Sequence, residues 1–193
     1  MGKLRRGMKG LLVVLGMLFV LGGCGKNVGK SEVKVEVADS AQLLNMVWDE
    51  FDESQKFAAM GGDFSNPVDG AAGIFNVADV ENLTYMLYIP TESVAMVDEA
   101  ASLIHAMNAN TFTGAAFHLT DAADADALVE ALKTNILNTQ WMCGFPDELV
   151  IYVVNGEYVV SAFGNAEIME NFKTKLSEIY GEGAVLAAEE KIA

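Results

Sequence analysis

Cysteine and histidine, the side chains most often used for metal binding and redox chemistry, are scarce in this sequence. The 193 residues contain two cysteines, Cys24 and Cys143, and two histidines, His105 and His118. The separation of 13 positions between the histidines matches no common zinc-ligand spacing, and Cys143 is their only soft companion. We therefore expect no metal site.

A second cysteine is also missing where a thioredoxin-type motif would need it. The segment WMCGFP places Pro146 where the resolving cysteine would stand, and no helical pattern begins at Cys143. A lone thiol between apolar neighbours is typical of a small buried hydrophobe, and we interpret Cys143 in this way.

Motifs for cofactor binding and nucleophilic catalysis are absent as well. No Walker lysine, dinucleotide-binding glycine pattern or G-x-S-x-G elbow is present. Asp121, Asp124 and Asp126 lack the glycine and glutamate of a calcium loop, and acids in a first helical turn are explained by the helix dipole. We expect no cofactor and no catalytic residue.

Basic residues are few, with 12 lysines and arginines against 27 acidic residues and a formal charge of −15. Nucleic-acid-binding proteins need a basic patch, so this class is excluded. Four of the basic residues lie in residues 1–10, and an apolar run, LLVVLGMLFVL, and Gly22-Gly23 follow. This order is typical of an export signal, and the run is too short to cross a bilayer, which needs about 20 residues.

The sequence Leu21-Gly22-Gly23-Cys24 resembles the lipobox of bacterial lipoproteins. The resemblance implies cleavage before Cys24, attachment of diacylglycerol to its thiol, and a location on the extracytoplasmic face of the cell envelope. Two or more acyl chains hold a protein stably on a membrane. We expect a signal peptide at 1–23, a lipidated cysteine and tether at 24–38, and a single domain at 39–185. Without residues 1–23 the formal charge is −19, from 8 basic and 27 acidic residues.

Hydrophobic periodicity predicts an α+β fold whose sheet contains antiparallel pairs and whose helices pack on one face. Helices are expected from Asp39 to about residue 51, over 91–107, after Asp121 and over 166–180, and strands near 83–89, 112–119, 148–154 and 157–163. The order from residue 83 is thus β-α-β-α-β-β-α. Residues 61–73 hold four glycines and one proline and are interpreted as a loop. Asn155-Gly156 predicts a type I′ hairpin turn.

Several of these segments resemble an uncharacterised domain found in lipoproteins of Gram-positive bacteria. The resemblance covers residues 75–180 and rests on Phe75-Asn76-Val77, FTGAAFHL, DADALVEAL, Trp141 and NGEYVVSAFGNAEIMENF. It implies a surface lipoprotein and supplies no activity and no site residue.

The leading functional hypothesis is a non-catalytic binding or interaction module on the envelope, with an envelope protein as partner. One alternative is a receptor for a small molecule or ion, with its pocket near residues 61–73. A second alternative is a hydrolase that uses carboxylates or His105. His105 is expected on the polar side of the 91–107 helix beside Asp98 and Ser102, but a serine one turn away comes without an oxyanion hole.

Overall fold

An eight-stranded antiparallel sheet forms the centre of the fold. The computed structural model describes residues 34–192, which belong to one compact unit. The expected signal peptide at 1–23 and the expected anchor Cys24 lie outside the described residues. The strands are β1 (Ala59–Gly62), β2 (Pro67–Asp69), β3 (Gly73–Phe75), β4 (Val97–His105), β5 (Phe112–Leu119), β6 (Glu148–Val154), β7 (Tyr158–Gly164) and β8 (Ala184–Lys191).

Four α-helices and four short 3₁₀ helices connect the strands of the described part of the chain. The α-helices are α1 (Ser40–Asp49), α2 (Val80–Leu87), α3 (Ala125–Leu137) and α4 (Ala166–Tyr180). The 3₁₀ helices are η1 (Thr91–Met96), η2 (Ala109–Thr111), η3 (Ala122–Asp124) and η4 (Gly181–Gly183). The strand order is β2-β1-β4-β5-β7-β6-β8, and β3 also pairs with β4. The α+β class and the antiparallel pairing are therefore confirmed.

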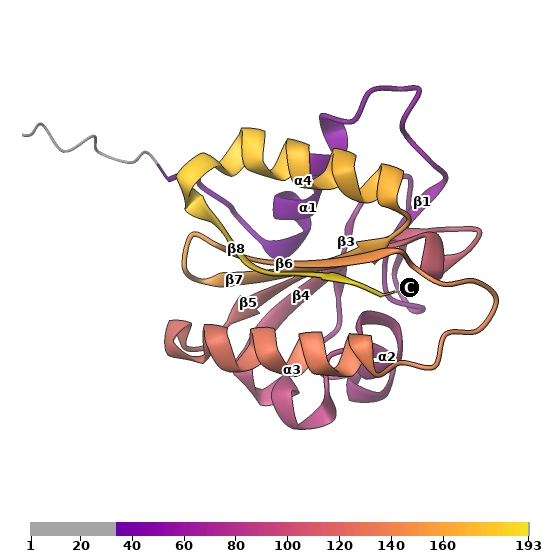
Figure 1. Cartoon of the computed structure of the whole chain (residues 1–193). Helices are drawn as coiled ribbons and strands as arrows, with labels where there is room; N and C mark the ends of the chain where they lie inside the picture. The colour runs from indigo at the N-terminus through magenta and orange to yellow at the C-terminus, as the bar shows by residue number, and fades with distance from the viewer. Residues whose placement is uncertain (1–33, 193) are drawn as a thin grey trace, which may run out of the picture. The chain divides into compact units, whose positions relative to one another are not determined.

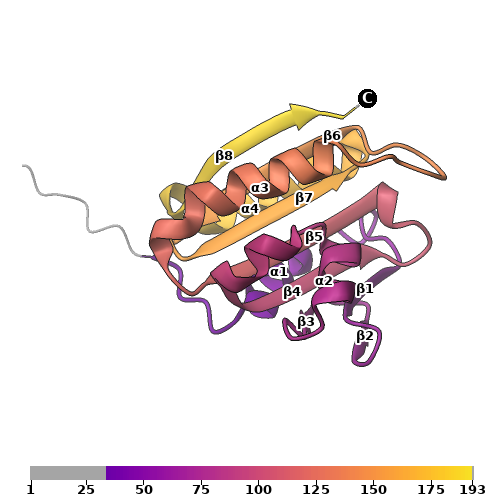
Figure 2. The ribbon, with the colours of Figure 1, turned by 90° about the horizontal axis from the view of Figure 1, so that it is seen from below.

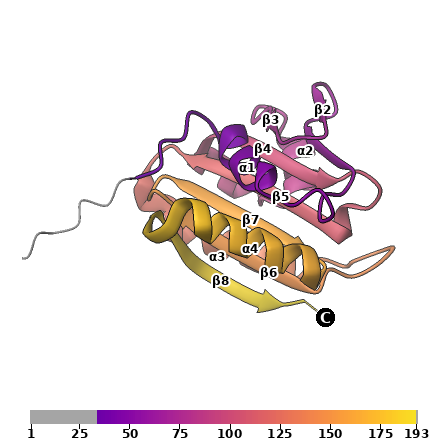
Figure 3. The same ribbon diagram turned by 90° about the horizontal axis from the view of Figure 1, so that it is seen from above.

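The helices cover both faces of the sheet, which corrects the expectation of a single covered face. Helices α1 and α4 lie on one side and α2 and α3 on the other (Figure 1). The same division is seen from below, where α2 and α3 stand in front (Figure 2), and from above, where α1 and α4 do (Figure 3). Each pair of helices closes its own hydrophobic core.

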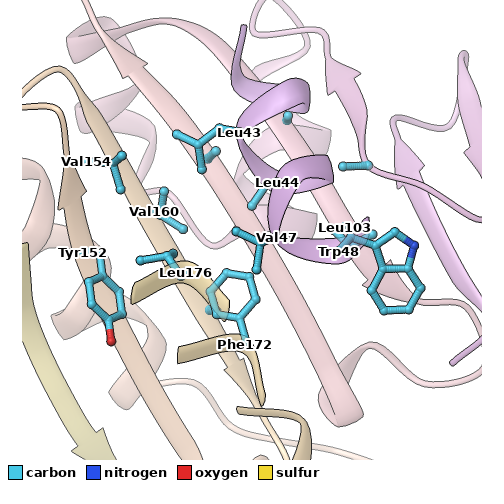
Figure 4. Close-up of a cluster of buried hydrophobic side chains, with 14 of the residues drawn as sticks. Leu43, Leu44, Val47, Trp48, Leu103, Tyr152, Val154, Val160, Phe172 and Leu176 are labelled. Atoms are coloured by element: carbon cyan, nitrogen blue, oxygen red, sulfur yellow. The ribbon is translucent and has the colours of Figure 1, made fainter. Parts of the chain in front are cut away.

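The core under α1 and α4 is built from residues whose spacing predicted a helix face. Leu43, Leu44 and Val47 of α1 are fully buried and belong to one cluster with the fully buried Phe172 of α4, beside which Val47 lies (Figure 4). Trp48 is buried on the same helix, and its indole N–H donates to the carbonyl oxygen of Gly70 at 2.8 Å. Trp48 therefore anchors the segment that carries the short strands.

Two elements were wrongly predicted from the sequence. Residues 83–89 belong to helix α2, which is capped by the Asp79 carboxylate and buries Leu83 and Leu87 one turn apart. Residues 91–107 form η1 and then strand β4, where a helix was expected. The order from α2 onward is thus α-β-β-α-β-β-α-β. Strand β8, which follows the last helix, was not predicted from the sequence.

The remaining predicted elements are confirmed. Strands β5, β6 and β7 and helices α1, α3 and α4 lie where hydrophobic periodicity places them. Asn155 and Gly156 have φ values of 56° and 75°, as a type I′ turn requires. Residues 61–73, interpreted as a loop, hold the end of β1, all of β2 and the first residue of β3.

The two ends of the sheet differ in what they contact. At one end, the Lys34 ammonium donates to the carbonyl oxygen of Asn155, and the Asn155 side chain donates to that of Val35. The described chain therefore begins beside the β6–β7 turn. The opposite end lies about 20 Å away, the length of a seven-residue strand. There β4 passes into β5 and the loop 138–147 enters β6 (Figure 1).

Candidate functional site

A mostly apolar pocket of about 400 Å³ opens at the end of the sheet opposite residue 34. It is lined by residues 60–64, Pro67, Met86 and residues 104–109. Pockets that bind small molecules or side chains commonly have volumes of about 300 to 1,000 Å³ and largely apolar walls. The pocket lies beside the glycine-rich segment 61–73, where the receptor alternative placed it.

Strand pairing brings the two main walls of the pocket together. Met60 of β1 is the antiparallel partner of Ile104 in β4, so two segments more than 40 residues apart become neighbours. Glycine is required here because β1 and β3 pass very closely. A Cβ atom on Gly61 would lie 2.3 Å from the backbone nitrogen of Gly73.

Asp63 fixes the loop that forms one lip of the pocket. It is almost fully buried, and its carboxylate accepts hydrogen bonds from the backbone N–H groups of Ser65, Asn66 and Asn76, at 2.8, 2.9 and 3.0 Å. Burial opposes ionisation of Asp63, but the three backbone donors outweigh it and hold its pKa below the usual carboxyl value. The neighbouring Phe64 is thereby presented to solvent on a fixed loop.

His105 shapes the opposite lip. Its ring stacks on Phe57, with centroids 5.0 Å apart, and its Nδ1 accepts a hydrogen bond from the backbone N–H of Met107 at 3.2 Å. The hydrogen bond to the imidazole thus stabilises the turn that carries Met107. This role is structural. The sequence suggested instead that His105 lies on a helix beside Asp98 and Ser102, whereas it is the last residue of strand β4.

Exposed apolar side chains extend from the pocket onto a neighbouring loop. Phe64 and Met107 line the pocket and are 65% and 83% exposed, and Met142 and Phe145 on the loop are 79% and 68% exposed. We call the pocket together with residues 142–145 the apolar end. Isolated exposed apolar residues are normal on proteins, but a group of them that borders a pocket makes this end of the sheet the candidate binding surface.

Two asparagines connect the loop to the pocket. The Asn110 side chain donates to the carbonyl oxygens of Met142 and Gly144, at 2.8 and 3.0 Å. Asn108, which lines the pocket, donates to that of Cys143 at 3.3 Å. The loop residues are therefore held against the pocket and form one surface with it.

The residues considered as catalytic candidates do not meet at the apolar end. Ser102 is fully buried, and its hydroxyl donates to the carbonyl oxygen of Gly62 at 2.8 Å. It lies three residues from His105 on a strand, so the two side chains point to opposite faces of the sheet. A serine–histidine pair is therefore not formed.

Asp98 pairs with His118 instead of His105. His118 Nδ1 lies 2.6 Å from Asp98 Oδ1, on neighbouring strands at the end of the sheet beside the β6–β7 turn. The Asp98 side chain is more than half exposed, and neither Asp98 nor His118 lines the pocket of the apolar end. The ring of Tyr158 packs edge-on against the His118 imidazole. Burial and nearby carboxylates raise the pKa of the Tyr158 hydroxyl, so it stays protonated. The two side chains of Asp98 and His118 therefore form a partly solvent-exposed contact away from the pocket of the apolar end.

Cys143 is exposed, which corrects its interpretation as a buried hydrophobe. It lies at a φ of 64° in the loop 138–147, and the exposed Met142 precedes it. Asp121 accepts from the backbone N–H of Ala123 and so begins the turn before α3, in agreement with its interpretation as a helix-start acid. Among residues 34–192, no three His, Cys, Asp or Glu side chains gather to hold a metal ion.

The apolar end was not predicted from the sequence. The exposed apolar residues of this surface lie in turn-forming stretches, DFSN, AMNAN and MCGF, whose other residues are mostly small and polar. A phenylalanine or methionine in such a stretch, with no apolar partner at strand or helix spacing, is the signal that could have found it.

Comparisons with models of protein families, with curated proteins and with solved structures gave no match. No helix among residues 34–192 combines the length and the apolar character that spanning a bilayer requires.

Proposed function

We propose that this chain is a lipid-anchored protein of the bacterial cell envelope that binds a protein partner through its apolar end and catalyses no reaction. The observation that carries the proposal is the position of the apolar end. It lies at the opposite end of the sheet from residue 34, through which a chain anchored at Cys24 would reach the domain. A module mounted in this way presents its apolar end away from the membrane.

The composition of the surface supports a protein partner. Methionine and aromatic side chains are enriched in the cores of protein interfaces, and charged residues are depleted there. At the apolar end Phe64, Met107, Met142 and Phe145 are exposed side by side with the pocket. Such a surface offers one cavity for an anchoring side chain and a surrounding area that can exclude water from it.

A receptor for a small apolar molecule is the second candidate, because the pocket lies beside residues 61–73 as that alternative expected. Both candidate ligands would occupy the pocket, but they differ in whether they also contact the exposed residues of the loop 142–145. A small ligand would need only the pocket residues, whereas a protein partner would also need Met142 and Phe145.

The proposed anchor is tested by metabolic labelling with a fatty-acid probe in a bacterium that expresses the full chain. We expect label on the wild type and none on Cys24→Ser. Equal labelling of the two forms would reject lipidation at Cys24.

The proposed binding surface is tested by photo-cross-linking in intact cells. A photoreactive amino acid is placed at Met107 of the full chain, and in a control at Val185, an exposed apolar residue on β8 near the other end of the sheet. We expect a discrete protein adduct from position 107 that Phe145→Ser weakens, and no such adduct from position 185. Adducts at neither position, or at both, would contradict the proposal.

A further inference from the structure

We propose that the apolar end takes a basic polypeptide segment, in which one or two large apolar side chains lie next to lysine or arginine. This inference rests on the proposed function and names the class of partner. The apolar side chain would enter the pocket between Phe64 and Met107, and the basic groups would face the acidic surface around it.

The pocket suits an apolar side chain of variable shape. Its volume of about 400 Å³ exceeds what one side chain needs, and three of its lining residues are Met60, Met86 and Met107. Methionine is unbranched and polarisable, so a methionine-lined wall can repack around leucine, methionine or phenylalanine. The position of the Asp63 carboxylate is fixed by three backbone donors, so the loop beneath Phe64 can stay in place while the methionines move.

The charges exclude an anionic occupant. Residues 34–192 contain 26 acidic side chains, six lysines and no arginine, and none of the lysines lines the pocket. Lys56, Lys133, Lys173 and Lys175 each pair with a carboxylate three residues away along the chain. A fatty acid would therefore place its carboxylate beside acidic groups, and no lysine of residues 34–192 lines the pocket to receive it.

The remaining two lysines do not change this conclusion. Lys34 donates to the carbonyl oxygen of Asn155 at the opposite end of the sheet. Lys191 is exposed, but it stands on β8, the edge strand on the other side of the sheet from β1 and β4, which carry the pocket.

Acidic groups are present where a basic segment would lie. Asp69 is exposed on β2 directly opposite Met60, which lines the pocket. Asp147 is exposed at the end of the loop that carries Met142 and Phe145. Beyond these two, the large negative charge of the whole domain attracts cations at long range and speeds their association. The same charge opposes a second copy of this chain, because two strongly negative domains repel each other.

The test measures the affinity of synthetic fluorescent peptides of 12 residues by anisotropy. A basic peptide alternates lysine with leucine, methionine and phenylalanine. An acidic peptide has glutamate in place of every lysine, and a polar peptide has serine in place of every apolar residue. The protein is the chain from residue 26 on, which keeps all of the described residues 34–192, and these belong to one compact unit. Laurate and a non-ionic maltoside detergent serve as lipid-like and neutral competitors.

We expect the basic peptide to bind at least about tenfold more tightly than either of the others, which corresponds to about 1.4 kcal/mol. Its affinity should fall between 0.05 and 0.5 M salt because charge attraction is screened. The variant Met107→Ser should weaken it about tenfold, an effect expected of a central interface residue. Val185→Ser, a matched removal of an exposed apolar side chain elsewhere, should leave it unchanged.

Three results would overturn the inference: equal or tighter binding of the acidic peptide, Met107→Ser binding like the wild type, or binding of no peptide while laurate or the maltoside binds. The third result, if Met107→Ser abolished it, would move the site to the small-molecule alternative. If no peptide binds but position 107 still forms a protein adduct in cells, the proposed function stands and the basic partner class falls.

Discussion

The side-chain amide of Asn110 donates a hydrogen bond to the carbonyl oxygen of Met142 at 2.8 Å. This contact joins the turn between β4 and β5 to the loop before β6, two segments that no secondary structure connects. It is the reason that Met142 and Phe145 belong to the same surface as the pocket.

Asn110→Ala should free this loop without unfolding the domain. Each lost hydrogen bond of this kind contributes about 0.5 to 1.5 kcal/mol, and the carbonyl oxygens left behind can turn to water. We expect faster amide hydrogen exchange over residues 141–145 and a narrower NMR line for the Met142 methyl group. The buried Met169 of α4 is the internal control, and a change in its methyl signal would show that the effect is global.

Asp63 gives the domain a pH-dependent contribution to stability. Because its pKa is lower in the folded state than in the unfolded chain, the stabilisation is complete above the unfolded value and is lost as pH falls through the folded value. Asp63→Asn replaces one acceptor by a donor, and we expect it to lower the unfolding free energy at pH 7 by about 1 to 3 kcal/mol. Urea unfolding of both proteins from pH 7 to pH 3 measures the difference.

The difference between Asp63→Asn and the wild type should be constant near neutral pH and shrink below about pH 4, where the unfolded carboxyl takes up its proton. Asp69→Asn, an exposed carboxyl on the same hairpin, is the control and should show little effect. A pH-independent difference would contradict the assigned hydrogen bonds.

Lys173 is held among three carboxylates. Its Nζ lies 3.0 Å from Oε1 of Glu148, which is only 4% exposed, and 2.8 Å from Oε1 of Glu189. Burial opposes the charge on Lys173, but the hydrogen bonds that its ammonium donates to Glu189 and Glu148 prevail and raise its pKa. Lys173→Met should cost about 3 kcal/mol, since Glu148 would keep only a distant Lys191.

Lys175→Met provides the comparison on the same helix. Lys175 pairs with Glu178, whose side chain is 60% exposed, so water can solvate this carboxylate once the lysine is removed and the effect on stability should be small. Chemical denaturation at pH 7 compares the two variants. Similar unfolding midpoints would show that Glu148 does not depend on Lys173.

The β6–β7 turn requires a residue that tolerates positive φ at Gly156. A Cβ atom there would meet nothing within 4 Å, so the penalty for Gly156→Val is purely conformational, about 1 to 3 kcal/mol. Glu157→Val, the exposed next position, adds the same side chain without positive φ and should unfold near the wild-type temperature. Equal melting temperatures of the two variants would refute the type I′ assignment.

The elements that the sequence predicted share a simple property: each shows one clear periodicity. Helices α1, α3 and α4 repeat their apolar residues at helical spacing, and β6 and β7 are apolar runs joined by Asn155-Gly156. Both wrong predictions come from tertiary context. Strand β4 is covered on both faces, so Ala100, Ala101 and Leu103 are all buried and the alternation of a half-exposed strand disappears.

Helix α2 was mistaken for a strand because its residues are aromatic and apolar. Leu83 and Leu87 are the only buried residues of α2, while Tyr85 is largely exposed, and a short helix of eight residues shows this pattern only once. The pocket was partly foreseeable, since residues 61–73 form one wall. Its other wall, residues 104–109, is brought there by the pairing of Met60 with Ile104, which no local pattern reveals.

The NMR signals of the methionine methyl groups test the role of the apolar end most directly. Met60, Met86 and Met107 line the pocket, whereas Met46 and Met169 belong to the side of the sheet covered by α1 and α4. On titration of the ¹³C-methyl-labelled chain with the basic apolar peptide, we predict saturable shifts of the first three signals and none for the last two. Shifts confined to Met46 or Met169, or no shift of any pocket methionine at saturating peptide, would contradict a binding surface at the apolar end.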